Sequence, residues 1–256
     1  MSTDRNFDEI FEQFHRRIKG TKKGLLREAL LREDIEALVL RTKTGKLRVL
    51  DAGCGLGDMG LWLASQGHEV WATDISEKMV AHTRSKAQEA GLADLLHVEQ
   101  QSVQAALQAG RTYDLICIHA VMEWLAEPYA MLALIPPALA PGGFVSLSVY
   151  NLHRSVFNSL IKGSFRKVMA EDFSGISNAM TPPNPIDPQQ VTIELEKLGL
   201  KVSLQAGLRC FYDYFSPKAK EEHSLDDVLV LERRYRHLVP YRDFARYVHF
   251  IAQKIS

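Results

Sequence analysis

Short apolar runs alternate with amphipathic stretches through the middle of the chain. Apolar positions at helical spacing separate the runs, and the run at 113–118 is almost continuously apolar, as in a strand buried on both faces. The strand-like runs are 47–51, 69–73, 97–99, 113–118 and 144–150. This rhythm predicts an α/β fold, a Rossmann-like doubly wound, seven-stranded and mostly parallel sheet with helices on both faces. Ligands of such sheets bind at the carboxyl ends of the strands.

The segments outside this core have different patterns, and together they predict a single domain with four parts. Phe7, Ile10 and Phe11 indicate a helix-prone N-terminal extension over 1–45, interrupted by Gly20 and Gly24, with a helix over 25–40. The cofactor-binding core spans 46–150. Residues 151–187 are expected to cover the substrate side of the site, with a basic helix at 153–170 and a proline-rich loop. The C-terminal part, 188–256, adds helices at 188–198 and 216–237 and strands at 200–204 and 247–252, the last antiparallel.

Residues 48–60, RVLDAGCGLGDMG, form a strand that turns through glycines into a helix. Without side chains, the backbone of such a turn can approach a ligand closely, and the new helix offers free N–H groups. Gly55, Gly57 and Gly60 satisfy the spacing of dinucleotide-binding turns, and Asp74 ends the next strand, where a carboxylate holds ribose hydroxyls. A nicotinamide-dependent oxidoreductase is therefore one interpretation.

Asp51 favours a second ligand, S-adenosylmethionine. A carboxylate directly before the glycines would repel a pyrophosphate, but it suits a ligand with a positive amino group and a sulfonium. His119 ends the strand at 113–118, beside the expected methionine end of the cofactor, and we interpret it as a cofactor contact, with a base or a packing residue as alternatives. Arg27 could reach the cofactor carboxylate if the extension folds over the turn.

Charge and cysteine content indicate which kinds of partner and cellular compartment fit this chain. The formal net charge is zero, but basic residues gather in three segments, 15–27, 153–167 and 233–254, which permits local nucleic-acid contact. No apolar run approaches the roughly 20 residues that a membrane span needs. Three widely spaced cysteines without metal-ligand spacing indicate a reducing, cytoplasmic compartment and no metal site.

Several stretches together resemble one family, the bacterial tRNA 5-carboxymethoxyuridine methyltransferases, over nearly the whole chain. They are DRNFDEI, GTKKGLLR, VLDAGCGLG, HAVMEW, SVYN, FYDY, ERRY and PYRDFARYVH. The resemblance implies methyl transfer from S-adenosylmethionine to the carboxylate of the 5-oxyacetate group on the tRNA wobble uridine, giving a methyl ester. It implies cofactor contacts at Arg27, Gly53, Cys54, Asp74, Val103, Gln104 and His119, to which the turn adds Asp51 and Gly55.

This reaction needs positioning and no catalytic base, because a carboxylic acid with a pKa of about 4 is already ionised at neutral pH. Arg209 and Arg154 are candidates to orient that carboxylate, with Tyr150 beside them. Tyr212 and Tyr214 are candidates to stack on the flipped uridine. Phosphates of the anticodon arm would meet Lys22, Lys23, Arg234, Arg242 and Arg246. The alternatives are a methyltransferase of a small carboxylic acid and a tRNA-binding protein that holds the cofactor without turnover.

Overall fold

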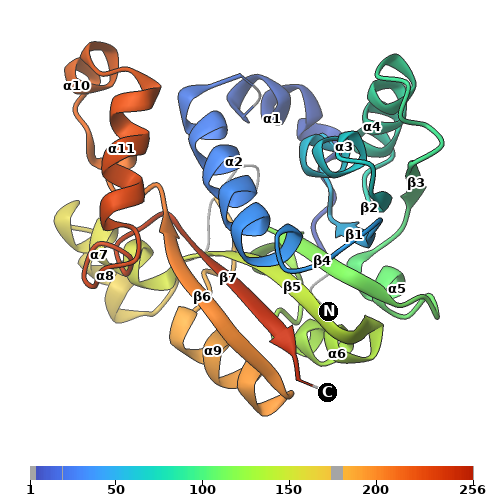
Figure 1. Ribbon diagram of the computed structural model, residues 1–256. Coiled ribbons are helices and arrows are strands. Elements are labelled where there is room, and N and C mark those ends of the chain that lie inside the picture. The colour runs from blue at the N-terminus through green and yellow to red at the C-terminus, as the bar shows by residue number, and fades with distance from the viewer. Residues whose placement is uncertain (1–3, 19, 174–180, 256) are drawn as a thin grey trace.

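Seven strands form one sheet in the computed structural model, which describes residues 4–18, 20–173 and 181–255 (Figure 1). The strand order is β3-β2-β1-β4-β5-β7-β6. The first five strands pair in parallel, and β7 is antiparallel to both β5 and β6. The bounds are β1 (Arg48–Ala52), β2 (Glu69–Asp74), β3 (Leu96–Gln100), β4 (Tyr113–His119), β5 (Leu139–Tyr150), β6 (Leu200–Leu208) and β7 (Tyr247–Lys254). The predicted seven-stranded, mostly parallel sheet is confirmed.

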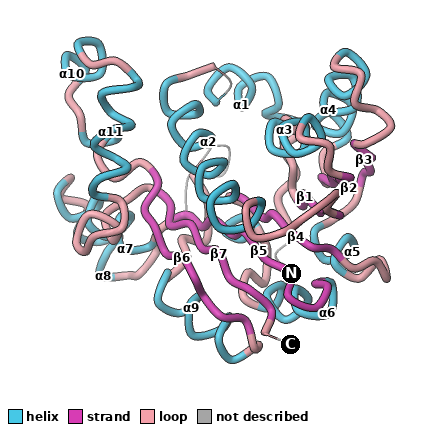
Figure 2. Tube along the Cα trace, viewed as in Figure 1, coloured by secondary structure: helices cyan, strands magenta, loops and turns pink. Residues whose placement is uncertain are grey.

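Helices cover both faces of the sheet and enclose two apolar clusters (Figure 2). One face carries α2 (Lys22–Ile35), α3 (Asp58–Ser65), α4 (Glu77–Glu89) and α11 (Leu225–Tyr235), and the other carries α5 (Val103–Leu107), α6 (Ile135–Ala138) and α9 (Pro188–Lys197). The remaining α-helices are α1 (Phe11–Ile18), α7 (Leu152–Ile161), α8 (Phe165–Met169) and α10 (Pro217–Glu222). No helix in the described residues is long and apolar enough to cross a membrane.

The strand β5 shows how the sheet separates the two clusters. Side chains along a strand alternate between faces. Phe144 therefore packs in the cluster under α2, whereas Val145 and Leu147 pack in the cluster under α9. Ser146 and Ser148 share the α2 face with Phe144, and both are fully buried. Polar groups on this face of β5 lie inside the protein, beneath the helix that belongs to the N-terminal extension.

Several predicted helices have different limits in the structure. Thr21 caps α2, and its Oγ1 accepts a hydrogen bond from the Gly24 amide at 3.3 Å. Gly24 therefore lies in the first turn of a helix and does not interrupt it, whereas Gly20, with φ of 68°, precedes the helix as an interruption. The helix predicted at 153–170 is divided into α7 and α8 around Gly163, and the one at 216–237 is divided into α10 and α11 where Ser224 caps α11.

One further segment differs from the sequence-based expectation. The sequence predicts a helix over 128–139, but the segment forms a 3₁₀ turn, Ala130–Leu134, followed by the short α6, because Pro136 and Pro137 provide no amides for a longer α-helix. The last strand, β7, is antiparallel as expected, and it lies between β5 and β6. The proline-rich loop lies partly outside the described residues, at 174–180. The division of the chain at 45, 150 and 187 stays a prediction.

The packing of the core predicts that two leucine substitutions change the free energy of unfolding by very different amounts. Leu30 in α2 is completely buried, so Leu30→Ala should lower the free energy of unfolding by about 2–5 kcal/mol. Leu231 in α11 is 44% exposed, and Leu231→Ala should change it by less than about 0.5 kcal/mol. Urea unfolding followed by circular dichroism measures both. Equal losses in the two variants would contradict the packing of α2 against the sheet.

Candidate functional site

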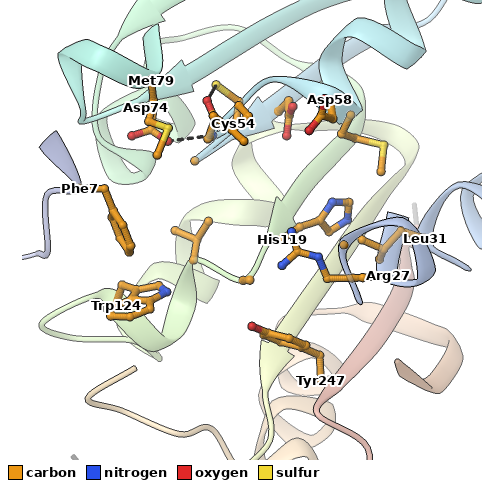
Figure 3. A pocket seen from close by; sticks show the side chains of 18 of the residues that line it. Phe7, Arg27, Leu31, Cys54, Asp58, Asp74, Met79, His119, Trp124 and Tyr247 are labelled. Atoms are coloured by element: carbon orange, nitrogen blue, oxygen red, sulfur yellow. Dashed lines mark hydrogen bonds between the residues drawn. The ribbon is translucent and has the colours of Figure 1, made fainter. Parts of the chain in front are cut away.

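A cavity of about 660 Å³ opens at the carboxyl ends of β1, β2 and β4 (Figure 3). Its walls come from the glycine turn, from α2 and the chain before it, and from the segments that follow β4 and β6. All the residues predicted to bind the cofactor line this cavity: Arg27, Asp51, Gly53, Cys54, Gly55, Asp74, Val103, Gln104 and His119. Of the residues predicted for substrate or tRNA, Lys23, Arg209 and Arg246 also line it.

The glycine turn has a shape that other residues cannot adopt without strain. Gly53, Gly55 and Gly57 have φ angles of 71°, 55° and 78°, in the left-handed region. Space is also limited, because a Cβ at Gly57 would lie 2.4 Å from Cγ2 of Thr83. The hydroxyl of Thr83 donates a hydrogen bond to the Gly55 carbonyl at 3.1 Å. The turn is thus fixed by α4 before any ligand binds, and its bare backbone faces the cavity.

Asp74 connects the turn to the end of β2. Its Oδ2 accepts a hydrogen bond from the Gly55 amide at 2.9 Å, and its Oδ1 accepts one from the Ser76 amide at 2.9 Å. Burial raises the pKa of this carboxyl group, against the lowering effect of those amides. Each oxygen still has acceptor capacity, because an ionised carboxylate offers about four lone-pair positions. The group is therefore oriented and can accept hydrogen bonds from a ligand with two hydroxyls.

Asp51 is the most strongly desolvated carboxyl group of the turn. It is 3% exposed, and its one hydrogen bond among the described residues comes from the Gly60 amide, 3.0 Å from Oδ2. Burial raises its pKa to about 7, and the neighbouring Asp74 and Asp58 act in the same direction. A buried carboxylate that lacks a cation is stabilised by a ligand that brings one. The site therefore favours a positively charged ligand group beside Asp51.

Arg27 and His119 lie side by side in the cavity, with Tyr247 next to them (Figure 3). The Arg27 guanidinium lies over the Tyr247 ring, 5.7 Å from its centroid, and has no ion pair within the described part of the chain. Burial, together with the charges of His249 and Arg27, holds the pKa of His119 well below its usual value. His119 is therefore neutral, and Arg27 is available to an anionic ligand group.

Three arginines surround one carboxylate next to the cavity. Arg209 follows β6 and donates a hydrogen bond to Oδ1 of Asp213. Arg154 of α7 and Arg246 before β7 approach Oδ2 of Asp213 at 3.7 Å and 3.8 Å. Burial raises the pKa of Asp213, but the three guanidinium groups outweigh it, so the pKa is lowered and the carboxylate is ionised. Three positive charges against one negative charge leave this arginine cluster (Arg154, Arg209, Arg246, Asp213) able to bind an anion.

Unused donors and strain point to the same function for the arginine cluster. The Nε atoms of Arg154, Arg209 and Arg246 are buried without a hydrogen-bond acceptor in the described structure. Arg209 also has a φ of 63°, a left-handed conformation that costs a residue with a side chain on the order of 1 kcal/mol or more. Strain of this kind persists where the surrounding structure holds a functional group in place.

The predicted tyrosines lie behind the cluster or away from it. Tyr150 is 4% exposed and lies under the Arg246 guanidinium, whose central carbon is 4.9 Å from the ring centroid. Tyr214 lies under Arg154 and donates a hydrogen bond to the Phe244 carbonyl. Tyr212 lies beside Lys220. In this conformation the first two support the arginines, and none of the three lines the cavity.

Three predicted phosphate contacts lie outside the cavity. The Lys22 ammonium donates hydrogen bonds to the carbonyls of Lys220 and His223, at 2.9 Å and 3.0 Å, which connects α2 to α10. Arg242 pairs with Asp243, and Arg234 lies over the ring of Tyr235. Their roles toward tRNA stay predictions, and for Lys22 the structure shows a structural role as well.

The sequence does not reveal the role of Asp213, and it predicts phosphate contact for Arg246, which in the structure lines the cavity. Only the FYDY stretch marks Asp213, and nothing local shows that arginines from three distant segments meet there. Among the described residues, no group of three or more His, Cys, Asp or Glu side chains is placed to hold a metal ion.

Comparison with known proteins agrees with this geometry. A family model described as a methyltransferase domain matches residues 49–143. The tRNA 5-carboxymethoxyuridine methyltransferase of Escherichia coli is 37% identical over 254 residues, which covers 98% of this chain and 97% of that protein. A ubiquinone biosynthesis O-methyltransferase of Cereibacter sphaeroides is 30% identical over 118 residues, 46% of this chain and 47% of that protein.

Solved structures share the fold at low sequence identity. Magnesium protoporphyrin IX methyltransferase from Synechocystis PCC 6803, determined with bound SAH, superposes with a TM-score of 0.67 at 18% identity, covering 97% of this chain and 96% of that one. At this identity the similarity supports the class I methyltransferase fold and nothing finer.

The raised pKa of Asp51 predicts a pH-dependent stability. The folded state holds the proton of the Asp51 carboxyl group more tightly than the unfolded state does. The contribution of Asp51 to the free energy of unfolding therefore falls as pH rises from about 4 to about 7. Asp51→Asn removes the effect. Between pH 4 and pH 8, the free energy of unfolding of the variant should therefore rise relative to that of the wild type, by on the order of 3 kcal/mol.

Denaturant unfolding at the two pH values measures this difference. Asp94→Asn, at an exposed position of the same residue type, is the matched control. A stability difference between Asp51→Asn and the wild type that stays constant with pH would show that Asp51 is not a strained, desolvated carboxylate.

Proposed function

Since the chain belongs to the family of tRNA 5-carboxymethoxyuridine methyltransferases, we propose that it methylates the carboxylate of 5-carboxymethoxyuridine in tRNA, with S-adenosylmethionine as methyl donor. The product is the methyl ester. The observation that carries the proposal is the arginine cluster, a buried group with excess positive charge beside a cavity that also contains the glycine turn. A methyltransferase with an anionic nucleophile needs both features in one place.

The residues of the cavity fit S-adenosylmethionine. The Asp51 carboxylate stabilises positive charge, and Asp74 offers acceptors for two ribose hydroxyls. Arg27 is the donor for the carboxylate of the amino-acid end, and the bare turn at Gly53 and Gly55 allows close approach of the ligand. When bound, the cofactor supplies a methyl group on an electrophilic sulfonium. A dinucleotide fits less well, because Asp51 would repel its pyrophosphate.

On the substrate side, the chain's own task is to bind and orient an anion. The substrate carboxylate is ionised at neutral pH, so no group has to remove a proton. Arg209 and Arg246 line the cavity and would hold the carboxylate by charge-assisted hydrogen bonds. Asp213 fixes the direction of Arg209 and offsets one of the three positive charges. Orientation of this kind can lower a barrier by about 7–11 kcal/mol.

The tRNA is proposed to bind through exposed basic side chains, with its anticodon arm presenting the wobble uridine to the cavity. Lys23 lies at the cavity, and Lys162 and Arg166 are exposed on the α7–α8 segment that follows β5. These, with Arg234 and Arg242, are the proposed phosphate contacts. The three cysteines are free thiols, in keeping with the cytoplasmic location that forms part of the proposal.

The proposal predicts a labelled, alkali-sensitive product. The protein is incubated with labelled S-adenosylmethionine and bulk tRNA from cells that lack it, and the labelled nucleoside is identified after digestion. We expect label on 5-carboxymethoxyuridine, released by mild alkali as from an ester. Label that resists alkali would exclude carboxyl methylation. Label on small carboxylic acids but not on tRNA would mean that the substrate is a small acid, and the assignment of the fold would still hold.

Removal of one cluster arginine should impair turnover more than cofactor binding. Arg246→Gln leaves Asp213 paired with Arg209 and Arg154, so the fold is retained. Loss of one preorganised donor should lower kcat by about a hundredfold, and the Kd of S-adenosylhomocysteine should change by less than about threefold.

The matched control is Arg233→Gln, because Arg233 is an exposed arginine paired with Glu33, away from the cavity. It should change neither quantity. A wild-type kcat in Arg246→Gln would mean that the arginine cluster does not hold the reacting carboxylate.

A further inference from the structure

A chain of buried hydrogen bonds runs from the cavity to Asp34, about two turns along α2 from Arg27. His119 Nε2 is 2.8 Å from Ser146 Oγ, and Ser146 Oγ is 2.8 Å from His249 Nε2. His249 Nδ1 is 2.7 Å from Oδ2 of Asp34, and Arg236 donates to both oxygens of this carboxylate, to Oδ1 at 3.0 Å and to Oδ2 at 2.5 Å. Ser146 and His249 are fully buried, and Arg236 is 2% exposed.

The inner end of this chain fixes the protons on His249. Burial raises the pKa of Asp34, but His249 and Arg236 outweigh it, so the pKa is lowered and the carboxylate can only accept. His249 Nδ1 must therefore donate to it. Burial lowers the pKa of His249, even against the hydrogen bond that its Nδ1 donates to Asp34 and the charge of that carboxylate, so the ring is neutral. A neutral imidazole carries one proton, and Nε2 of His249 is thus an acceptor.

The outer end follows from the single proton of the Ser146 hydroxyl. Ser146 donates that proton to His249 Nε2, and its oxygen accepts from the other neighbour, His119 Nε2. His119 is neutral, so with its proton on Nε2 its Nδ1 carries a lone pair. None of the described residues forms a hydrogen bond with this Nδ1, and His119 lines the cavity.

We propose that Asp34, His249 and Ser146 are positioning residues that hold His119 in its Nε2–H tautomer, so that Nδ1 accepts a hydrogen bond from the α-ammonium group of the cofactor. The identity of the ligand rests on the proposed function. Arg27, beside His119, faces the same end of the ligand and complements its carboxylate. Arg27 thus donates to the carboxylate of the cofactor's amino-acid end, and Nδ1 of His119 accepts from its ammonium group. The other tautomer of His119 would direct an N–H at the ammonium and repel it.

The arrangement also explains why polar groups interrupt the apolar core beneath α2. Asp34 comes from α2, and the rest of the chain of hydrogen bonds comes from the neighbouring strands β4, β5 and β7. Polar groups buried in a core are costly unless they are satisfied, and in this chain of hydrogen bonds Ser146, His249 and Asp34 are each bonded to both of their neighbours. The open acceptor of the chain is Nδ1 of His119, which lines the cavity.

The tautomer is measured directly by ¹⁵N NMR of the ligand-free protein, in which protonated and unprotonated ring nitrogens have distinct shifts. His119→Gln assigns the signals. We expect the Nε2–H form at His119 in the wild type and a mixture of both forms in Ser146→Ala. Ser148→Ala is the matched control, since Ser148 lies on the same face of β5 and its buried hydroxyl has no hydrogen-bond partner in the described chain. An Nδ1–H ring in the wild type would overturn the proposal.

The consequence for binding is measured by calorimetry with two ligands. S-adenosylhomocysteine has the amino-acid end, and 5′-methylthioadenosine lacks it. In Ser146→Ala we expect the Kd of the first to rise in inverse proportion to the remaining Nε2–H fraction of His119, about twofold for an equal mixture, and the Kd of the second to stay unchanged. An equal effect on both ligands, or none on either, would overturn the proposal. If the wild type binds neither ligand, the proposed function fails, while the tautomer measurement still decides the state of His119.

Discussion

The site depends on two buried groups of unlike charge at one cavity, the Asp51 carboxylate of the glycine turn and the arginine cluster. Asp51 is buried with a single backbone donor, and the arginine cluster is buried with one carboxylate for three guanidinium groups. Electrostatic interactions are much stronger at low dielectric than in water, so each group selects its ligand strongly by charge. The carboxylate favours a cation and the arginines favour an anion. A reaction that joins a sulfonium methyl group to a carboxylate uses both preferences at once.

The N-terminal extension belongs to the site and is not an accessory to it. Arg27 and Asp34 both come from α2, one at the cavity and one at the inner end of the hydrogen-bond chain from His119. The Lys22 ammonium fastens the start of the same helix to α10. Because α2 also buries Leu26, Leu30 and Ile35 against the sheet, the geometry of the cavity and the stability of the core are coupled.

Local patterns predicted much of this arrangement. The glycine turn, Asp51 and Asp74 are contiguous with strands whose apolar runs are visible in the sequence, and their positions follow from the rule that parallel strands end at one edge. The partners of Arg209 and His119 could not be found in this way. Ser146 meets His119, Asp34 meets His249, and Asp213 meets Arg154 and Arg246 through tertiary packing between distant segments. Nothing local distinguishes a buried serine from an exposed one. Helix limits at Gly24 and Gly163 also depended on capping and backbone geometry that periodicity does not show.

In the proposed function, the arginine cluster holds the substrate through the negative charge of its carboxylate. The most direct test is the affinity of the protein, loaded with S-adenosylhomocysteine, for two anticodon stem-loops that differ only at the wobble uridine. One carries the free carboxylate and the other its methyl ester. We expect at least about tenfold tighter binding of the carboxylate, since a charge-assisted pair contributes about 1.5–3 kcal/mol. Equal affinities would mean that the arginine cluster does not hold the substrate by its charge.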